Sequence, residues 1–306
     1  MDSLKNFEVI KSTIYQSPEF CEFMTLYNFK SFQLKNKTYF HIFNFGPFYI
    51  LKSFRADFSE DSMSEIEDLT NNKFGNLLIK ISPNIGFDQT LSEKFKYAKS
   101  EKNISASKTL IKDLTNSEEE MFKSFSENTR YKINRSYREK DRIEIYQNPS
   151  NFILNILYNS LSERQKTKNF RTYDLREITK LRDILKDNTY VFLAYNSENK
   201  LVVSNFYVGY KNKISYFTGS LNTENRNSRA GYQLINEAFK YFKRQGYIIY
   251  DFEGLSDERL PKDYEKWLGF SKFKKQFSKE EITYPLSMIK FNSMLLKFVS
   301  KFDNTF

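Results

Sequence analysis

Residues that build disulfides and metal sites are almost missing from this chain. Its 306 residues include one cysteine, Cys21, and one histidine, His41. A single cysteine cannot form a disulfide within the chain, and these two side chains would need several carboxylates to complete a zinc site. We therefore expect a reducing compartment and a mechanism without metal, and we expect neither residue to be catalytic.

Long apolar runs are missing as well, and glycine and proline are scarce. No stretch approaches the roughly 20 apolar residues of a membrane-spanning helix. The first ten residues, MDSLKNFEVI, lack the basic start and apolar run of a signal peptide. Nine glycines and six prolines leave little room for linkers, while 40% apolar and 17% aromatic residues can fill two folded domains. We expect a cytoplasmic globular protein.

Positive charge is concentrated in two segments of the chain. The formal net charge is +10; residues 123–142 hold seven basic and three acidic side chains, and residues 262–279 hold six lysines and two acidic side chains. Aromatic residues lie between the lysines of the second segment. This clustering favours a polyanionic partner, namely tRNA, a nucleotide-linked substrate or an anionic membrane surface. A charged, solvated surface is the simpler alternative.

The second half of the chain has a readable order of elements. Residue patterns predict helices over 152–163, 175–185 and about 231–245, and strands over 191–196, 201–210, 214–220 and 247–253. The resulting order is helix, helix, three antiparallel strands, helix and strand. This order resembles one lobe of the GNAT-type N-acyltransferases.

The first half shows a similar succession less cleanly. Its pattern predicts a hairpin over 38–52, a strand over 77–81, and helices over 60–71 and 117–140. We therefore predict an α/β fold of two GNAT-like lobes, each a mixed, mostly antiparallel sheet flanked by helices.

The lobe boundary is expected at the turn-forming sequence Asn148-Pro149-Ser150. The first lobe then covers residues 1–147 and the second lobe covers residues 148–284. We expect the C-terminal segment, residues 285–306, to pack back on the first lobe.

One segment argues against acyl-CoA as the donor. GNAT lobes that bind acyl-CoA carry a Gln/Arg-x-x-Gly-x-Gly/Ala turn, whose main-chain amides bind the pyrophosphate at a helix N-terminus. The corresponding stretch here runs from Arg226 to Gly231, with Arg229 in place of the middle glycine. We expect Arg229 to crowd the pyrophosphate, so the lobe keeps its shape without the coenzyme.

Five segments in the same order resemble motifs of the FemABX family, which adds amino acids from aminoacyl-tRNA to peptidoglycan precursors. They are Lys108–Glu120, Asn128–Ser136, Tyr216–Ser220, Tyr250–Gly254 and Phe273–Phe277, and they extend over most of the chain. Glu253 and Gln276 stand where the family has glycine, and Ser136 stands where it has alanine. The resemblance implies a tandem GNAT-like fold, aminoacyl transfer for interpeptide bridges of the cell wall, and a compact form without a coiled-coil arm.

The resemblance also implies direct transfer, with aminoacyl-tRNA as co-substrate and no cofactor. An amine of the stem peptide attacks the ester that joins the amino acid to tRNA, and a fixed cation stabilises the negative oxygen that develops. Lys274, in the Phe-Lys motif, is implied as that cation. Lys275 is a candidate for contact with the tRNA end or a phosphate. Because the attacking amine must be neutral, a proton acceptor is needed, and Glu253 is a candidate for it.

Further polar residues are candidates for binding the two substrates. Arg164, Lys166, Lys168 and Arg171, with the Tyr216 hydroxyl, are candidates for the phosphates of an acceptor such as UDP-MurNAc-pentapeptide or lipid II. Arg130, Arg135 and Arg138 are candidates for the tRNA backbone. With a lipid-linked acceptor, the basic faces would also contact the inner membrane surface.

Two alternative functions stay open at this point. The first is an acyl-CoA-dependent N-acyltransferase of the same fold, acting on a sugar amine or a polyamine. The second is a nucleic-acid-binding protein that uses its basic faces for adhesion and catalyses nothing. Aminoacyl transfer that depends on Lys274 would exclude the second alternative, and tight binding of acetyl-CoA would favour the first.

Overall fold

The computed structural model describes residues 6–73, 76–168, 172–222 and 228–292, without the side chains of residues 71–73, 167, 168, 262 and 263. Internal contacts divide the chain into two compact units. Unit 1 is Met1–Ser12, Thr109–Ser256 and Glu265–Ile282. Unit 2 is Thr13–Lys108, Asp257–Tyr264 and Thr283–Phe306.

The strands form two mixed sheets. The first sheet has the order β12 (Glu280–Thr283), β6 (Lys108–Asp113), β11 (Ile249–Asp251), β10 (Lys213–Leu221), β9 (Leu201–Tyr210), β8 (Thr189–Tyr195) and β7 (Arg142–Gln147). The second sheet has the order β1 (Lys30–Gln33), β2 (Tyr39–Phe45), β3 (Phe48–Ala56), β4 (Asn76–Pro83), β13 (Met288–Phe291) and β5 (Ala98–Lys99).

Ten α-helices lie within the described residues. They are α1 (Phe7–Lys11), α2 (Pro18–Met24), α3 (Glu60–Lys73), α4 (Thr90–Lys94), α5 (Glu118–Lys123), α6 (Glu127–Arg138), α7 (Asn151–Lys168), α8 (Leu175–Leu185), α9 (Ala230–Arg244) and α10 (Pro261–Lys274). The helices expected over 152–163, 175–185 and 231–245 correspond to α7, α8 and α9. The predicted α/β class, with two sheets flanked by helices, is confirmed.

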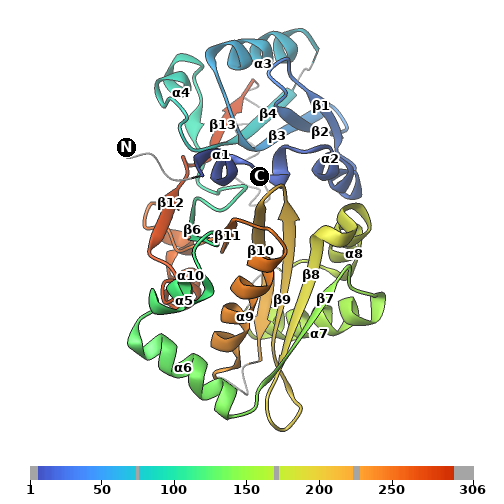
Figure 1. Cartoon of the computed structure of the whole chain (residues 1–306). Coiled ribbons are helices and arrows are strands. Elements are labelled where there is room, and N and C mark those ends of the chain that lie inside the picture. The colour runs from blue at the N-terminus through green and yellow to red at the C-terminus, as the bar shows by residue number, and fades with distance from the viewer. Residues whose placement is uncertain (1–5, 74–75, 169–171, 223–227, 293–306) are drawn as a thin grey trace. The chain divides into compact units, whose positions relative to one another are not determined.

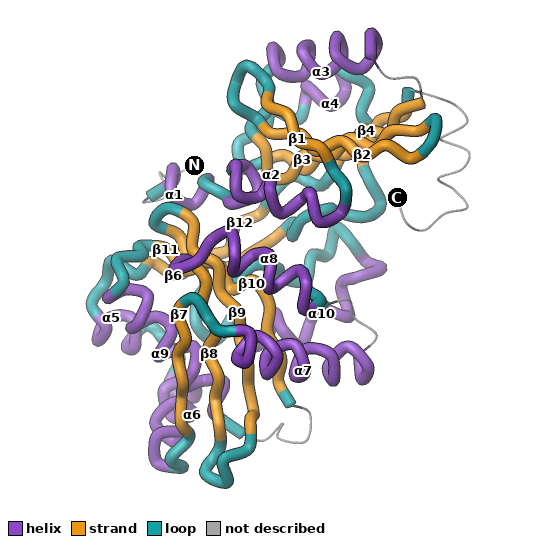
Figure 2. Tube along the Cα trace, turned by 90° about the vertical axis from the view of Figure 1, so that its right-hand side faces the viewer, coloured by secondary structure: helices purple, strands orange, loops and turns teal. Residues whose placement is uncertain are grey.

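Unit 1 has helices on both faces of its sheet. Helices α7 and α8 cover one face, and α9 with α5 and α6 covers the other (Figures 1 and 2). Strands β7 to β10 are antiparallel neighbours, whereas β10 and β11 run parallel and are joined by the crossover helix α9. The core between the sheet and α9 is rich in aromatic residues, among them Phe192, Tyr207, Phe239 and Phe242.

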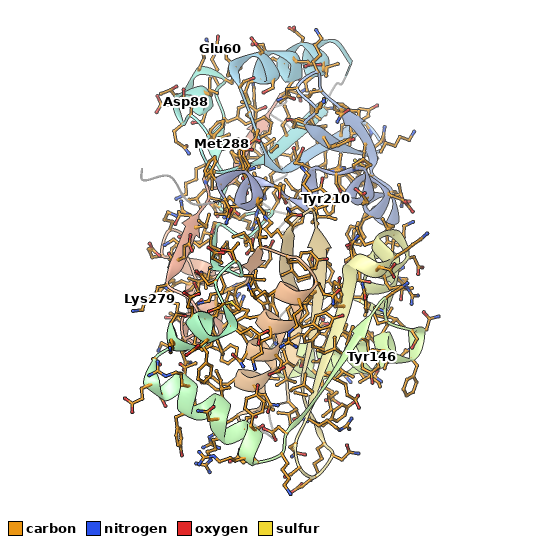
Figure 3. All side chains as sticks on the ribbon, in the orientation of Figure 1. Glu60, Asp88, Tyr146, Tyr210, Lys279 and Met288 are labelled. Carbon is orange, nitrogen blue, oxygen red and sulfur yellow. The ribbon has the colours of Figure 1, made fainter. Side chains whose placement is uncertain are left out.

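Unit 2 has a smaller core beneath one helix. Helix α3 lies on one face of its sheet and α2 on the other (Figure 2). Met63 and Ile66 of α3 pack with Leu51, Ile79 and Ile81 of the central strands. Strand β13, which carries Met288 (Figure 3), pairs antiparallel with β4. Residues of the segment 285–306 therefore join the sheet of unit 2.

The observed units divide the chain differently from the expected boundary near residue 148. Strands β6 and β7, which were expected in the first lobe, pair with β11 and β8 in the sheet of unit 1. Local sequence identifies both segments as strands, but it carries no information about which sheet each strand joins. The boundary prediction failed because that choice depends on pairing between distant parts of the chain.

The single helix predicted over 117–140 is two helices in the structure. Helix α5 begins at Ser117, whose side chain forms a capping box with Glu120. Ser126 caps α6 by accepting a hydrogen bond from the Thr129 amide, so the chain turns between Ser124 and Ser126. The apolar stripe hid this break because Phe122 and Phe125 still pack against one core.

Candidate active site

The end of strand β11 is held by a buried lysine from α10. Lys274, the last residue of α10, is 5% exposed. Its ammonium group donates hydrogen bonds to the main-chain oxygens of Phe252, Glu253 and Gly254 at 2.8, 2.5 and 2.8 Å. An ammonium group has three protons, so all its donors are used by the turn that follows β11.

This turn depends on two residues with left-handed backbone. Glu253 has a φ of +44° and Gly254 a φ of +72°. A Cβ added to Gly254 would lie 2.6 Å from the Trp267 ring, so glycine is required there for space as well as conformation. Glu253, in contrast, carries a side chain in a conformation that favours glycine. Glycine would therefore fit this position with less backbone strain than Glu253.

A buried carboxylate fixes the start of the turn. Asp251, 1% exposed, accepts hydrogen bonds from the Thr109 hydroxyl at 2.6 Å and from the Glu253 amide at 2.9 Å. The Lys213 ammonium lies 3.8 Å from its other oxygen and donates to the Ile10 carbonyl. Asp251 is therefore a positioning residue, whereas Glu253 is only partly buried.

Strands β10 and β11 separate beside this turn. They pair from Lys213 to Ser215 on β10, but β10 continues to Leu221, with an irregularity in its pairing to β9 between Tyr216 and Thr218. The Tyr216 hydroxyl donates to the Asn205 side chain at 3.1 Å. A Cβ on Gly219 would overlap this hydroxyl, so Gly219 makes room for the Tyr216 ring. The irregular pairing thus places Tyr216 where the two strands diverge.

A second cation lies at the same place. Arg164 of α7 donates to the main-chain oxygen of Gly219, and its guanidinium group lies 4.2 Å from the centre of the Phe270 ring. The Lys274 ammonium lies 5.4 Å from the centre of the Tyr216 ring. Helices α7 and α10 therefore bring two cations to the main-chain oxygens around the separation of β10 and β11.

Burial changes the protonation of these groups. It lowers the pKa of Lys274 to about 7, against the opposing effect of the Glu253 and Asp251 carboxylates, while Arg164 adds to the drop. Burial raises the pKa of Tyr216 to about 12, although the Arg164 charge acts in the other direction. Near neutral pH, Tyr216 is therefore protonated and Lys274 exchanges between ammonium and amine.

The other predicted substrate residues are not gathered at this site. Lys166 is exposed on α7, and Lys275 is exposed and pairs with Glu281 at 3.0 Å. Lys168 is the last residue of α7, and its side chain is not among those described. Arg171 lies outside the described residues. Among the predicted residues, the structure brings together Lys274, Glu253, Tyr216 and Arg164.

The basic residues of α6 divide into two kinds. Arg130 donates to the carbonyls of Lys123 and Phe125, at 3.0 and 2.7 Å, and so caps the end of α5. Arg135 pairs with Glu139 at 2.7 Å, and Arg138 is exposed. Residues Arg135 and Arg138 thus remain candidates for a polyanion, whereas Arg130 has a structural role.

Three further residues build the site and were not predicted from the sequence. Asn205 accepts from Tyr216 and donates to the Tyr207 hydroxyl at 3.0 Å, Thr109 holds Asp251, and Trp267 packs over Gly254. Asn205 offered a signal, because it and Ser204 are polar residues inside a strand that is otherwise rich in apolar and aromatic residues. Thr109 lies in the first resembling segment, and Trp267 is the chain's one tryptophan, but neither local pattern indicates a contact with the end of β11.

Arg229 lies at the start of α9, next to the helix that the sequence predicts from about residue 231. It is the N-cap residue of α9, and its guanidinium group lies 3.5 Å from Glu139. A Cβ at Gly231 would make ordinary contacts with Val203 and Phe273, so this glycine is not required by space. Arg226 lies outside the described residues. The exclusion of acyl-CoA by this turn therefore stays a prediction.

Metal-binding clusters and membrane-spanning helices are both absent from the described residues. No group of three or more His, Cys, Asp or Glu side chains within them could hold a metal ion. No described helix has the length and apolar character needed to cross a membrane.

Comparison with known proteins identifies the fold. No family model matches the sequence, and no curated protein matches it. Among solved structures, FemX aligns with 97% of this chain and 98% of its own, with a TM-score of 0.75 and 14% identity. The chain thus has the fold of FemX over both units, and the expected FemABX-like tandem fold is confirmed.

Two further structures share the fold less closely. L-PGS from Bacillus licheniformis aligns with a TM-score of 0.56 and 16% identity, covering 94% of this chain and 96% of its own. The C-terminal domain of a putative lysylphosphatidylglycerol synthetase from Agrobacterium fabrum aligns with a TM-score of 0.58 and 12% identity, covering 97% and 93%. At such identities the likeness establishes fold alone.

Proposed function

We propose that this protein is an aminoacyltransferase that moves an amino acid from aminoacyl-tRNA to an amine of a peptidoglycan precursor. One observation carries the proposal: the buried Lys274 ammonium at the end of β11, held by three main-chain oxygens next to Glu253 and Arg164. The FemX-like fold and the five sequence segments support it.

The proposed reaction needs a positive field and a proton acceptor. The amine nitrogen bonds to the ester carbonyl carbon, and the bond from that carbon to the tRNA ribose oxygen breaks. The nitrogen loses one proton and the ribose oxygen gains one. Lys274 and Arg164 supply positive charge for the carbonyl oxygen, and Glu253 is the proposed acceptor of the amine proton.

The hydrogen bonds of Lys274 define how it acts in this proposal. Its donors are used by the turn 252–254, so it acts through its charge and by holding the turn that carries Glu253. A direct bond to the substrate oxygen would require one of the three carbonyls to be released. Arg164, bound to the Gly219 carbonyl, adds charge at the other side of the strand separation.

A phospholipid acceptor is the second candidate. Two of the similar structures are a lysylphosphatidylglycerol synthetase domain and L-PGS, which favours transfer to a lipid headgroup as an alternative. A hydroxyl would then replace the amine as the nucleophile, and the same cations would stabilise the same carbonyl oxygen. The site residues are shared by both candidates, so the acceptor must be identified by experiment.

The decisive experiment measures mass gain on the acceptor. Purified protein is incubated with mixed aminoacyl-tRNAs and, separately, UDP-linked precursor, lipid-linked precursor and phosphatidylglycerol vesicles, with acetyl-CoA as a parallel donor. We expect one amino-acid residue to be added to a peptidoglycan precursor. Addition to the phospholipid alone would establish the second candidate, and acetylation alone would refute aminoacyl transfer.

A pair of variants on one helix tests the role of Lys274. Lys274→Met removes the buried ammonium, and Lys272→Met removes an exposed lysine of α10 with the same charge change. We expect Lys274→Met to lose transfer by about 100-fold or more, the scale of one lost electrostatic group in acyl transfer. Lys272→Met should retain the wild-type rate. An equal loss of transfer in both variants would contradict the role assigned to Lys274, because it would show that only the net charge of the protein matters.

A further inference from the structure

A pocket of about 260 Å³ lies within unit 2, beside the last two strands of its sheet. Its wall includes Gln89, Ser92, Lys99, Arg259, Leu286 and Met288. Lys99 and Met288 are directly opposite each other in the antiparallel pairing of β5 and β13, so their side chains lie on the same face of the sheet. The proposed transfer reaction uses none of these residues.

The Arg259 side chain of this wall is held in place by several acceptors. Its Nε atom donates to the two carboxylate oxygens of Asp257 at 2.9 and 3.1 Å, and its Nη2 atom donates to one of them at 2.6 Å. Nη2 also donates to the main-chain oxygens of Ser107 and Tyr284, at 3.2 and 3.0 Å. The Nη1 atom has no hydrogen-bond partner among the described residues. The guanidinium group is therefore oriented before a ligand binds and keeps one nitrogen for it.

Lys99 supplies the net charge of the pocket wall. Although burial opposes the change, hydrogen bonds from Arg259 and Ser107 lower the pKa of Asp257 to about 2, so Asp257 is ionised and balances Arg259. Lys99 is exposed, and its ammonium group forms no ion pair within the part of the chain that the structure describes. The wall thus carries one net positive charge, which matches a ligand with one negative charge.

The remaining wall residues are apolar or neutral. Leu286 and Met288 offer apolar surface, and the side-chain amide of Gln89 has no hydrogen-bond partner among the described residues. The Ser92 hydroxyl donates to the main-chain oxygen of Gln89 at 2.7 Å. Pockets for drug-sized ligands occupy roughly 300–1,000 Å³. This pocket therefore suits a smaller ligand, the size of an amino acid or a dipeptide.

We propose that this pocket binds a carboxylate joined to a small apolar body, such as the carboxyl end of a short peptide. The carboxylate accepts hydrogen bonds from Arg259 and Lys99, and the apolar body lies against Leu286 and Met288. A phosphate monoester carries close to two negative charges at neutral pH and would exceed the charge of the wall. The site stands independently of the proposed reaction. Only the identification of the peptide as the stem peptide of an acceptor rests on the proposed function.

N-acetyl-alanyl-alanine is the probe that tests this site, and the same dipeptide with a C-terminal amide is its control. Binding of each to the full-length protein is measured by calorimetric titration, without tRNA. We expect the amide to bind about tenfold more weakly or worse, the loss expected for a charge-assisted hydrogen bond. Butyrate in a parallel titration distinguishes the source of the carboxylate. If butyrate binds as tightly as the dipeptide, the pocket accepts free carboxylic acids, and if it binds more weakly, the pocket prefers a peptide.

Two lysine variants in one sheet test the assigned contact. Lys99 and Lys30 are exposed residues on β5 and β1, the two edge strands of the sheet in unit 2. Lys99→Met should weaken dipeptide binding by about tenfold and leave the unfolding curve nearly unchanged, whereas Lys30→Met should bind as the wild-type protein does. Arg259 is a poor first target, because its loss would also leave the carbonyls of Ser107 and Tyr284 without this donor.

Three results would overturn the proposal. They are equal binding of the dipeptide and its amide, equal weakening by Lys99→Met and Lys30→Met, and no binding to the wild-type protein at millimolar concentrations. Failure of aminoacyl transfer leaves these binding results intact, so the two proposals fail separately. If the dipeptide binds but peptidoglycan precursors do not compete with it, the site stands and its link to the proposed acceptor is refuted.

Discussion

The Lys274 ammonium group lies over the Tyr216 ring, 5.4 Å from its centre. The same group donates hydrogen bonds to main-chain oxygens of the turn after β11. Tyr216 comes from β10, Lys274 from the end of α10, and the oxygens from the turn after β11. A cation over an aromatic face gains roughly 0.5–2 kcal/mol, more when water is excluded. The pairing therefore offsets part of the cost of burying the lysine.

The first prediction concerns the pH dependence of transfer. The Lys274 cation is present below its pKa of about 7 and is lost as the pH rises through that value. If this charge stabilises the reacting oxygen, transfer should decline above neutral pH, while the need for a neutral amine limits it at low pH. The measurement is kcat/KM against pH. A rate that keeps rising well above pH 8 would show that the ammonium form is not required.

The second prediction concerns stability at alkaline pH. The pKa of Lys274 falls from 10.5 in the unfolded chain to about 7 in the fold. Between these values the unfolded state binds more protons, so stability should rise with pH, by up to about 1.4 kcal/mol per unit from this residue. Denaturant unfolding at pH 7 and pH 9.5 should show the rise in wild-type protein relative to Lys274→Met. Parallel curves for the two proteins would contradict it.

The third prediction separates space from conformation at Gly254. Gly254→Ala forces a Cβ against the Trp267 ring and also strains a positive φ. Gly246→Ala is the matched control in unit 1, since its φ is +86° and a Cβ there meets nothing within 4 Å. We expect about 1 kcal/mol of destabilisation for Gly246→Ala and about 3 kcal/mol or more for Gly254→Ala. If denaturant unfolding shows the same loss of stability for both variants, the Trp267 ring can move aside at little cost in free energy.

Sequence patterns predicted helices α7, α8 and α9, strands β8 to β10 and the overall class, because these depend on local periodicity. Helices α7, α8 and α9 have a clear apolar stripe or run, and β8 to β10 are rich in β-branched and aromatic residues. The sheet that each strand joins depends on distant partners. For this reason β6 and β7 were assigned to the wrong lobe.

The candidate site was predicted only in part, because local motifs can be recognised in the sequence whereas contacts between distant segments cannot. Lys274, Glu253 and Tyr216 lie in short motifs, so their positions could be recognised along the chain. The use of all three Lys274 protons by the turn 252–254 depends on the path of the main chain after β11. The structural role of Arg130 likewise depends on the unpredicted break between α5 and α6.

The fourth prediction tests Glu253 as proton acceptor. Glu253→Gln keeps the shape of the side chain and removes its charge, so transfer should fall by about 100-fold or more if the carboxylate accepts the amine proton. Glu253→Gly should lose the same activity yet stabilise the fold by about 1 kcal/mol, since glycine relieves the positive φ. Rates and unfolding curves are compared for both variants. Full activity in Glu253→Gly would assign the residue no role in proton transfer.

The fifth prediction distinguishes the two kinds of arginine on α6. Arg138 is exposed, so Arg138→Ala should leave stability nearly unchanged and weaken tRNA binding, and it should reduce the salt dependence of binding by about one phosphate contact. Arg130→Ala frees the carbonyls of Lys123 and Phe125 and should cost about 1–2 kcal/mol of stability. Binding of labelled tRNA at several salt concentrations, with unfolding of the same samples, measures both effects. If Arg130→Ala reduces the salt slope and Arg138→Ala does not, tRNA contacts the other side of α6, and the division drawn from the hydrogen bonds of Arg130 is wrong.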